Sequence, residues 1–114
     1  EPAIHTEGRM LRNEILDEAA RRLVSHFQPE RIILFGSQAR GDADDRSDAD
    51  FLVITRFTGK RRSLMLAMDR ALRGLDLARD IVVLTPEEYE RDRAIPGTIA
   101  RPAAQEGKCL YERE

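Results

Sequence analysis

The spacing of apolar residues divides the first part of the chain into a helix and a strand. Between Gly8 and Phe27, apolar side chains recur every three or four positions with charged residues between them, which is the pattern of an amphipathic helix. Pro29 cannot continue a helix, and the run from Arg31 to Phe35 after it is short, β-branched and almost entirely apolar. We therefore predict a helix that covers a core, followed by a buried strand.

The middle of the chain alternates between the same two patterns. An apolar run predicts a second strand over 48–55, and helical spacing returns over 63–73. Gly74 follows, at a place where a helix end commonly needs a left-handed residue. A third apolar run predicts a strand over 80–84. This segment is therefore expected to fold as strand, helix, strand.

The last third of the chain begins with a strong helix-start signal. From Thr85 to Glu88 the chain has a capping threonine, a proline at the first helical position and a glutamate three residues after the cap. These residues predict a short helix through about Arg93. Prolines and a glycine then interrupt the pattern, and we predict a last helix and a closing strand over 108–112. The order of elements predicts an α/β sheet covered by helices.

Composition and charge narrow the class of protein. The chain has 114 residues, with 19 Lys and Arg against 21 Asp and Glu, which describes one small domain over 1–114 with its core in 9–112. The net charge of −2 lacks the basic footprint of a dedicated nucleic-acid binder. No apolar run approaches the ~20 residues that span a bilayer, and no secretory pattern opens the chain. We therefore predict a cytoplasmic protein.

The single cysteine agrees with a reducing compartment. Cys109 has no second cysteine within the chain to pair with, so no internal disulfide can form. It sits among alternating apolar positions, which favours a buried thiol over a reactive one. We expect Cys109 to be part of the core.

The turn after the strand at 31–35 has features of an anion-binding site. Gly36 lets the backbone approach a ligand closely, and Ser37 adds a hydroxyl and a free N–H at the expected start of a short helix. A Gly-Ser pair is also common in ordinary strand-to-helix turns, so this signal is weak alone. Arg40 could contact a phosphate through two nitrogens, or it could pair with an acidic residue of the 42–45 loop.

Three aspartates stand where two predicted strands begin. Asp48 and Asp50 are two residues apart, so their side chains leave the same face with Cα atoms roughly 6–7 Å apart. Aspartates also start ordinary turns, but the apolar run 51–54 anchors this pair to a core strand. Asp80 adds a third carboxylate. Such oxygen donors suit Mg²⁺, whereas two His and one Cys argue against a zinc site.

These residues resemble the signature of the DNA polymerase β-like nucleotidyltransferase superfamily. The resemblance consists of Gly36-Ser37, ten further residues and then Asp48-x-Asp50, set in Ile-Leu-Phe-Gly-Ser-Gln-Ala-Arg-Gly and Ser-Asp-Ala-Asp-Phe-Leu-Val. It is specific over 31–55 and extends to the strand at Asp80 and to the ending 110–112. The short chain is similar to the minimal nucleotidyltransferases of this superfamily.

The resemblance implies a fold, a reaction and a partner. The fold is a mixed β-sheet flanked by α-helices, and the reaction transfers a nucleoside monophosphate, AMP if the NTP is ATP, to an acceptor hydroxyl. By position, Asp48 and Asp50 would bridge two Mg²⁺ or Mn²⁺ ions and Asp80 would be the third ligand and the base. Gly36-Ser37, with Arg40, would hold the triphosphate. Many minimal members resemble antitoxins that add AMP to a HEPN-type RNase toxin, which implies a protein partner.

Two departures from the family pattern and two other interpretations remain. Ala49 stands where the family usually has a branched apolar residue, and Gly97 and Pro102 fall where it tends to have a regular last helix.

The chain could instead be a non-catalytic nucleotide-binding subunit that neutralises a partner by occlusion. It could also be an unrelated α/β domain whose aspartates bind a cation or cap a loop. The presence of all three acidic positions favours the enzyme.

Overall fold

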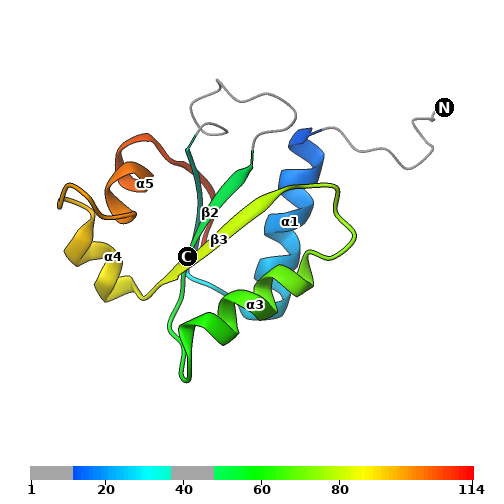
Figure 1. The fold of residues 1–114 in the computed structure, drawn as a ribbon, viewed down its shortest axis with the longest axis horizontal. Coiled ribbons are helices and arrows are strands. Elements are labelled where there is room, and N and C mark those ends of the chain that lie inside the picture. The colour runs from blue at the N-terminus through cyan, green and yellow to red at the C-terminus, as the bar shows by residue number, and fades with distance from the viewer. Residues whose placement is uncertain (1–11, 37–47) are drawn as a thin grey trace.

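The computed structural model describes residues 12–36 and 48–114, which form a four-stranded sheet with helices on both faces (Figure 1). In chain order the elements are α1 (Arg12–Phe27), β1 (Arg31–Phe35), β2 (Ala49–Ile54), α3 (Arg61–Ala71), β3 (Arg79–Leu84), α4 (Pro86–Asp92), α5 (Ala100–Glu106) and β4 (Lys108–Glu112). The strand order is β3-β2-β1-β4. β1 is antiparallel to β2 and β4, whereas β2 is parallel to β3. The predicted α/β fold with a mixed sheet is confirmed.

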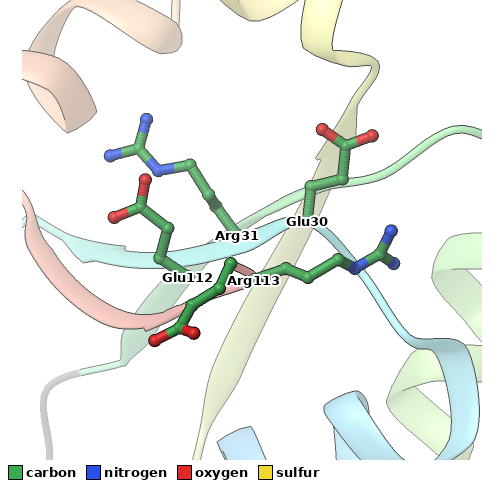
Figure 2. Close-up of a pocket in the computed structure, with 5 residues that line it drawn as sticks. Glu30, Arg31, Glu112 and Arg113 are labelled. Atoms are coloured by element: carbon green, nitrogen blue, oxygen red, sulfur yellow. The ribbon is translucent and has the colours of Figure 1, made fainter.

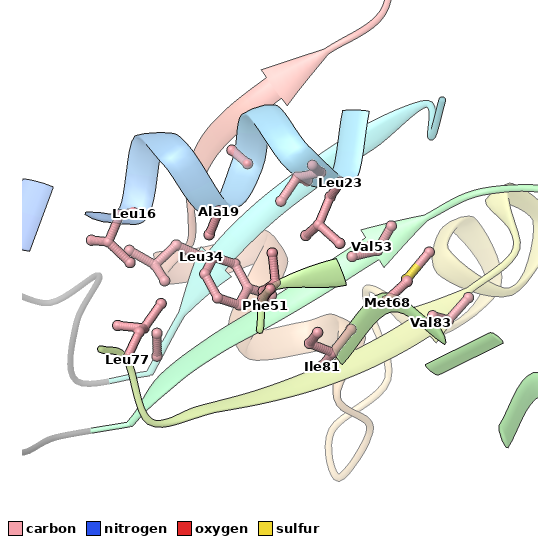
Figure 3. Close-up of a cluster of buried hydrophobic side chains, with 14 residues drawn as sticks. Leu16, Ala19, Leu23, Leu34, Phe51, Val53, Met68, Leu77, Ile81 and Val83 are labelled. Carbon is pink, nitrogen blue, oxygen red and sulfur yellow. The ribbon is translucent and has the colours of Figure 1, made fainter. Parts of the chain in front are cut away.

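The larger part of the core lies between the sheet and the helices α1 and α3. The helical spacing of α1 turns Leu16, Ala19 and Leu23 towards the sheet, where all three are buried. Side chains from α1, α3 and the strands gather around Phe51, which is fully buried (Figure 3). Met68 joins this cluster from α3. This face of the sheet therefore holds most of the apolar contacts that specify the fold.

A smaller apolar cluster lies on the opposite face, under α4 and α5. It contains Leu52 and Ile54 of β2 together with Tyr89 of α4. Successive residues of a strand point to opposite faces, so the burial of Phe51 towards α1 and α3 directs Asp50 to the α4 and α5 side. The same alternation applies to β3, where Ile81 belongs to the larger cluster and Asp80 points the other way. Both aspartates therefore lie on the face with the thinner helical cover.

Most predicted boundaries agree with the structure, and α3 differs by two residues. The strands predicted over 31–35 and 108–112 have those bounds, while the start expected for the first helix at Gly8 lies outside the described residues. Helix α3 spans Arg61–Ala71 where 63–73 was predicted, and Lys60 before it is extended and supplies no side-chain cap. The chain leaves this helix through a turn in which Gly74 has a φ of 92°.

The helix-start signal at Thr85 is confirmed in atomic detail. The Thr85 hydroxyl accepts a hydrogen bond from the Glu88 backbone N–H at 3.1 Å, and the Glu88 carboxylate accepts one from the Thr85 N–H at 2.9 Å. Helix α5 tolerates Pro102 because this proline lies in its first turn, where no intrahelical N–H is needed. No helix in the described part of the chain is long and apolar enough to cross a membrane.

The expectation that Cys109 is buried is wrong. Its thiol is exposed, and its Sγ lies 3.4 Å from the Tyr111 carbonyl oxygen. The reason is the position of β4 at the edge of the sheet, with an irregular register against β1 between Ile32 and Ile33. Alternation along β4 alone could not reveal that few residues cover this strand.

A pair of identical substitutions tests the position of the core. Leu23→Ala empties a fully buried site against the sheet and should reduce the free energy of unfolding by about 2–5 kcal/mol. Leu66→Ala removes the same atoms from an α3 side chain that is 50% exposed. This substitution should change the free energy of unfolding by less than about 0.5 kcal/mol. Urea unfolding measures both values. Equal losses would contradict the placement of α1 on the sheet.

Candidate active site

The register between β2 and β3 brings two of the predicted site residues together. Asp50 is paired directly with Asp80, and neighbouring strands lie about 4.8 Å apart. Paired residues of parallel strands point to the same face, so the two carboxylates leave the sheet side by side. β3 is an edge strand, and Asp80 is exposed there. The adjacent strand starts thus form an acidic edge.

Asp48 is the third member of the acidic edge, which we define as Asp48, Asp50 and Asp80. It lies one residue before β2 and is exposed. The backbone next to it is fixed, because the Ala49 N–H donates to the Ala78 carbonyl oxygen at 2.8 Å. This bond joins the segment that leads into β2 to the segment that leads into β3.

The electrostatics of Asp50 reflect the two carboxylates beside it. Partial burial raises the pKa of Asp50, and the negative charges of Asp80 and then Asp48 raise it further. Each of these causes disfavours the ionised form of Asp50. The acidic edge is therefore a place where a cation would relieve repulsion.

Gly36 leaves room for the Asp50 carboxylate. In the β1–β2 pairing Asp50 lies opposite Phe35, so the next residue of β1 passes close to its side chain. Gly36 has a φ of +78°, and a Cβ atom built there would collide with Oδ2 of Asp50. The sequence predicted Gly36 as a contact for a phosphate. Its contact with an aspartate was not predicted, because it depends on the pairing of β1 with β2.

Several predicted site residues lie outside the described part of the chain. These are Ser37, Arg40 and the acidic loop over 42–45, so their roles stay predictions. Sequence reasoning also overlooked Arg79, the residue directly before Asp80. Alternation along β3 is the signal that could have placed Arg79 on the α3 side of the sheet.

The donor set of the acidic edge suits a hard divalent cation. Mg²⁺ prefers carboxylate oxygens and keeps several positions for water and phosphate. Within residues 12–36 and 48–114, no group of three or more His, Cys, Asp or Glu side chains is placed so that it could hold a metal ion without other ligands. Asp50 and Asp80 are the part of this donor set that the strand register pairs directly.

A cavity of about 300 Å³ lies at the other end of the sheet and is separate from the acidic edge. Figure 2 shows Glu30, Arg31, Glu112 and Arg113 around it, so charges of both signs line it. Arg31 is paired with the last residue of β2, whereas Asp50 is near its first. The length of β2 therefore separates the cavity from the aspartates.

The fold is that of a nucleotidyltransferase. The chain is similar to the crystal structure of a candidate nucleotidyltransferase from Sulfolobus solfataricus, with a TM-score of 0.61 and 25% identity over 88% of this chain and 79% of that one. It is also similar to the structure of a toxin–antitoxin with AMP-PNP, with a TM-score of 0.59 and 23% identity over 91% and 76% of the two chains. The similarity to this second structure shows a shared fold and nothing more.

The sequence comparison gives the family. The model of the family described as Polymerase beta, Nucleotidyltransferase matches residues 17–114, and the chain belongs to this family. Nucleotidyltransferases of this superfamily generally use divalent metals. The chain is 48% identical over 52 residues to a candidate protein adenylyltransferase of Methanocaldococcus jannaschii, a match that covers 44% of this chain and 35% of the length of that relative.

Two glycines with similar backbone conformations test the contact between Gly36 and Asp50. Gly59 has a φ of +84° and no atom within 4 Å of a built Cβ. Gly59→Ala should therefore cost only the strain of a left-handed alanine, roughly 1–2 kcal/mol of unfolding free energy. Gly36→Ala carries the same strain and a collision with Asp50, so it should cost more and should also move the ¹³C resonance of the Asp50 carboxyl. Equal costs with an unmoved resonance would contradict the contact.

The raised pKa of Asp50 predicts that removing its charge stabilises the folded protein, by an amount that depends on pH. The folded protein holds the Asp50 proton more tightly than the unfolded chain, so the stability from this proton is present below the ordinary value of 3.8 and is lost as the pH rises through the folded pKa. In metal-free buffer at pH 7, Asp50→Asn should unfold at higher urea than the wild type, and this difference should shrink on acidification. Asp17→Asn on α1 controls for the loss of one negative charge. Lower stability of Asp50→Asn throughout would contradict the repulsion.

Proposed function

We propose that this chain is a metal-dependent enzyme that transfers AMP from ATP to a hydroxyl of a partner protein, with release of pyrophosphate as the bond between the α- and β-phosphates breaks. The observation that supports this most strongly is the pairing of Asp50 with Asp80, close to Asp48, on a nucleotidyltransferase fold. The similarity to a candidate protein adenylyltransferase supports both AMP as the transferred group and a protein as the acceptor.

Electrostatics links the nucleotide to metal in this proposal. A triphosphate cannot approach three carboxylates unless positive charge separates them, so we expect nucleotide and metal to bind together. Asp48, Asp50 and Asp80 would hold Mg²⁺ or Mn²⁺, two ions by analogy with the family. When bound, such ions neutralise phosphate charge and stabilise the attacking and leaving oxygens.

The burial and position of the individual residues suggest a different role for each in the reaction. Asp50 is partly buried and braced by β1, so it suits a fixed ligand. Asp80 is exposed on the edge strand β3, where an acceptor hydroxyl can reach it, and we assign it the role of the base that takes the hydroxyl proton. Gly36-Ser37 and Arg40 are the proposed contacts for the triphosphate.

The partner that we propose is a HEPN-type RNase toxin, with this chain as its antitoxin. The resemblance to minimal nucleotidyltransferases supports this, as does the similarity of the fold to a toxin–antitoxin structure with AMP-PNP. An acceptor carried by another protein also agrees with the exposure of Asp80 at the sheet edge. A cytoplasmic location stays a prediction.

Mass measurement tests the transfer directly. The chain is incubated with ATP, Mg²⁺ and a HEPN-type protein encoded beside its gene, and we expect the intact mass of that protein to rise by one or more AMP groups. Asp50→Asn removes a negative charge from the metal ligands without changing the side-chain shape, so transfer should fall by at least ~10². Asp76→Asn, an exposed carboxylate in the loop before β3, is the matched control and should keep the wild-type rate.

Two results would contradict the proposal. The first is no AMP addition with any NTP by a folded protein that binds the nucleotide. The second is full neutralisation of the partner by the Asp48→Asn, Asp50→Asn double variant. That result would favour neutralisation by occlusion.

A further inference from the structure

Arg79 makes three hydrogen bonds on the side of the sheet opposite to Asp80. Its Nε donates to Oδ1 of Asp69 at 3.0 Å, and its Nη2 donates to the Asp69 carbonyl oxygen at 3.0 Å. Its Nη1 donates to the Leu77 carbonyl oxygen at 3.0 Å. The Arg79 side chain is only 13% exposed. All three guanidinium nitrogens are therefore engaged in a sheltered position.

These bonds connect the start of β3 to the end of α3. Asp69 lies in the last turn of α3, and Leu77 lies in the connection that leads from this helix to β3. Arg79 is the first residue of β3 and therefore ties both ends of the connection together. We call this set of bonds the Arg79 brace.

The start of β3 needs such support because of its position and its charge. Within the described residues β3 is an edge strand, paired with β2 on one side. The register places the like charges of Asp50 and Asp80 next to one another across this pairing, where they repel. An edge strand without support could relieve the repulsion by moving Asp80 away from Asp50. The Arg79 brace opposes this movement from the opposite face.

We propose that Arg79 is a positioning residue, which holds Asp80 at the separation from Asp50 that a shared divalent cation requires. Arg79 touches neither the cation nor the nucleotide in this account, and it acts through the backbone of β3. The inference depends on the proposed function of the acidic edge. Outer residues that orient metal ligands typically change metal affinity 10- to 100-fold when they are removed.

Arg22 provides a matched control for the substitution of Arg79. It also bonds one carboxylate and two carbonyl oxygens, namely Glu18 at 2.9 Å, Ala71 at 3.3 Å and Arg73 at 3.0 Å. The bonds to Ala71 and Arg73 hold the end of the same helix α3 from α1, and neither of them reaches β3. Arg22→Met and Arg79→Met therefore remove equivalent sets of bonds, and only the second releases the start of β3.

The experiment measures Mn²⁺ binding directly by electron paramagnetic resonance, in the presence of saturating non-hydrolysable ATP analogue. We expect Arg79→Met to weaken Mn²⁺ binding about 10-fold or more, and Arg22→Met to change it less than about twofold. In the transfer reaction, Arg79→Met should raise the metal concentration needed for half-maximal rate and leave the KM for ATP at saturating metal unchanged. Urea unfolding of both variants reports the general loss of stability.

Asp69→Ala is a second variant in case Arg79→Met does not fold. It removes one acceptor of the brace from a side chain that is 55% exposed and keeps both carbonyl acceptors. Mn²⁺ binding should weaken in the same direction by a smaller factor. Unchanged Mn²⁺ affinity in this variant, or equal affinities in Arg79→Met and Arg22→Met, would overturn the positioning role.

Asp50→Asn separates this inference from the proposed function. If the wild type binds Mn²⁺ with the nucleotide and Asp50→Asn does not, the acidic edge is the metal site and the Arg79 results decide the positioning role alone. If the wild type binds no Mn²⁺ with the nucleotide, or Asp50→Asn binds it equally well, both the proposed function and the role of Arg79 are overturned.

Discussion

The parallel register between β2 and β3 is the constraint on which the proposed chemistry depends. It pairs Asp50 with Asp80, and a shift of one residue would send one of them to the opposite face. The apolar residues that follow fix this register, because β2 packs into a core on both faces of the sheet. Phe51 is buried in the cluster on one face, and Leu52 is buried in the cluster on the other. Burial along the strand thus holds two carboxylates side by side although they repel one another.

The two faces of the sheet contribute differently to the molecule. The face under α1 and α3 contains the larger apolar cluster and the Arg79 brace, so it gives the strands a rigid support. The face under α4 and α5 is covered by short helices over a smaller cluster, and the acidic edge belongs to this face. In the proposed function the first face therefore supports the ligands, and the second receives the nucleotide and the acceptor.

Local patterns predicted the elements of the fold well. Apolar runs located the strands and the Thr85 capping signal located α4, because these features depend on neighbours in sequence. The spacing of Asp48 and Asp50 likewise drew attention to the start of β2. What could not be predicted depends on which strands are paired: the contact of Gly36 with Asp50, the exposure of Cys109 and the contacts of Arg79. Periodicity carries no information on strand order or register, so these features required the structure.

A crystal structure of the chain with Mn²⁺ and a non-hydrolysable ATP analogue tests the central claim most directly. Anomalous scattering identifies Mn²⁺ independently of the protein atoms. The account predicts an anomalous peak at coordination distance, about 2 Å, from carboxylate oxygens of both Asp50 and Asp80, with nucleotide phosphate oxygens completing the shell. Nucleotide bound elsewhere, for example in the cavity between Arg31 and Glu112, with no metal at Asp50, would contradict it.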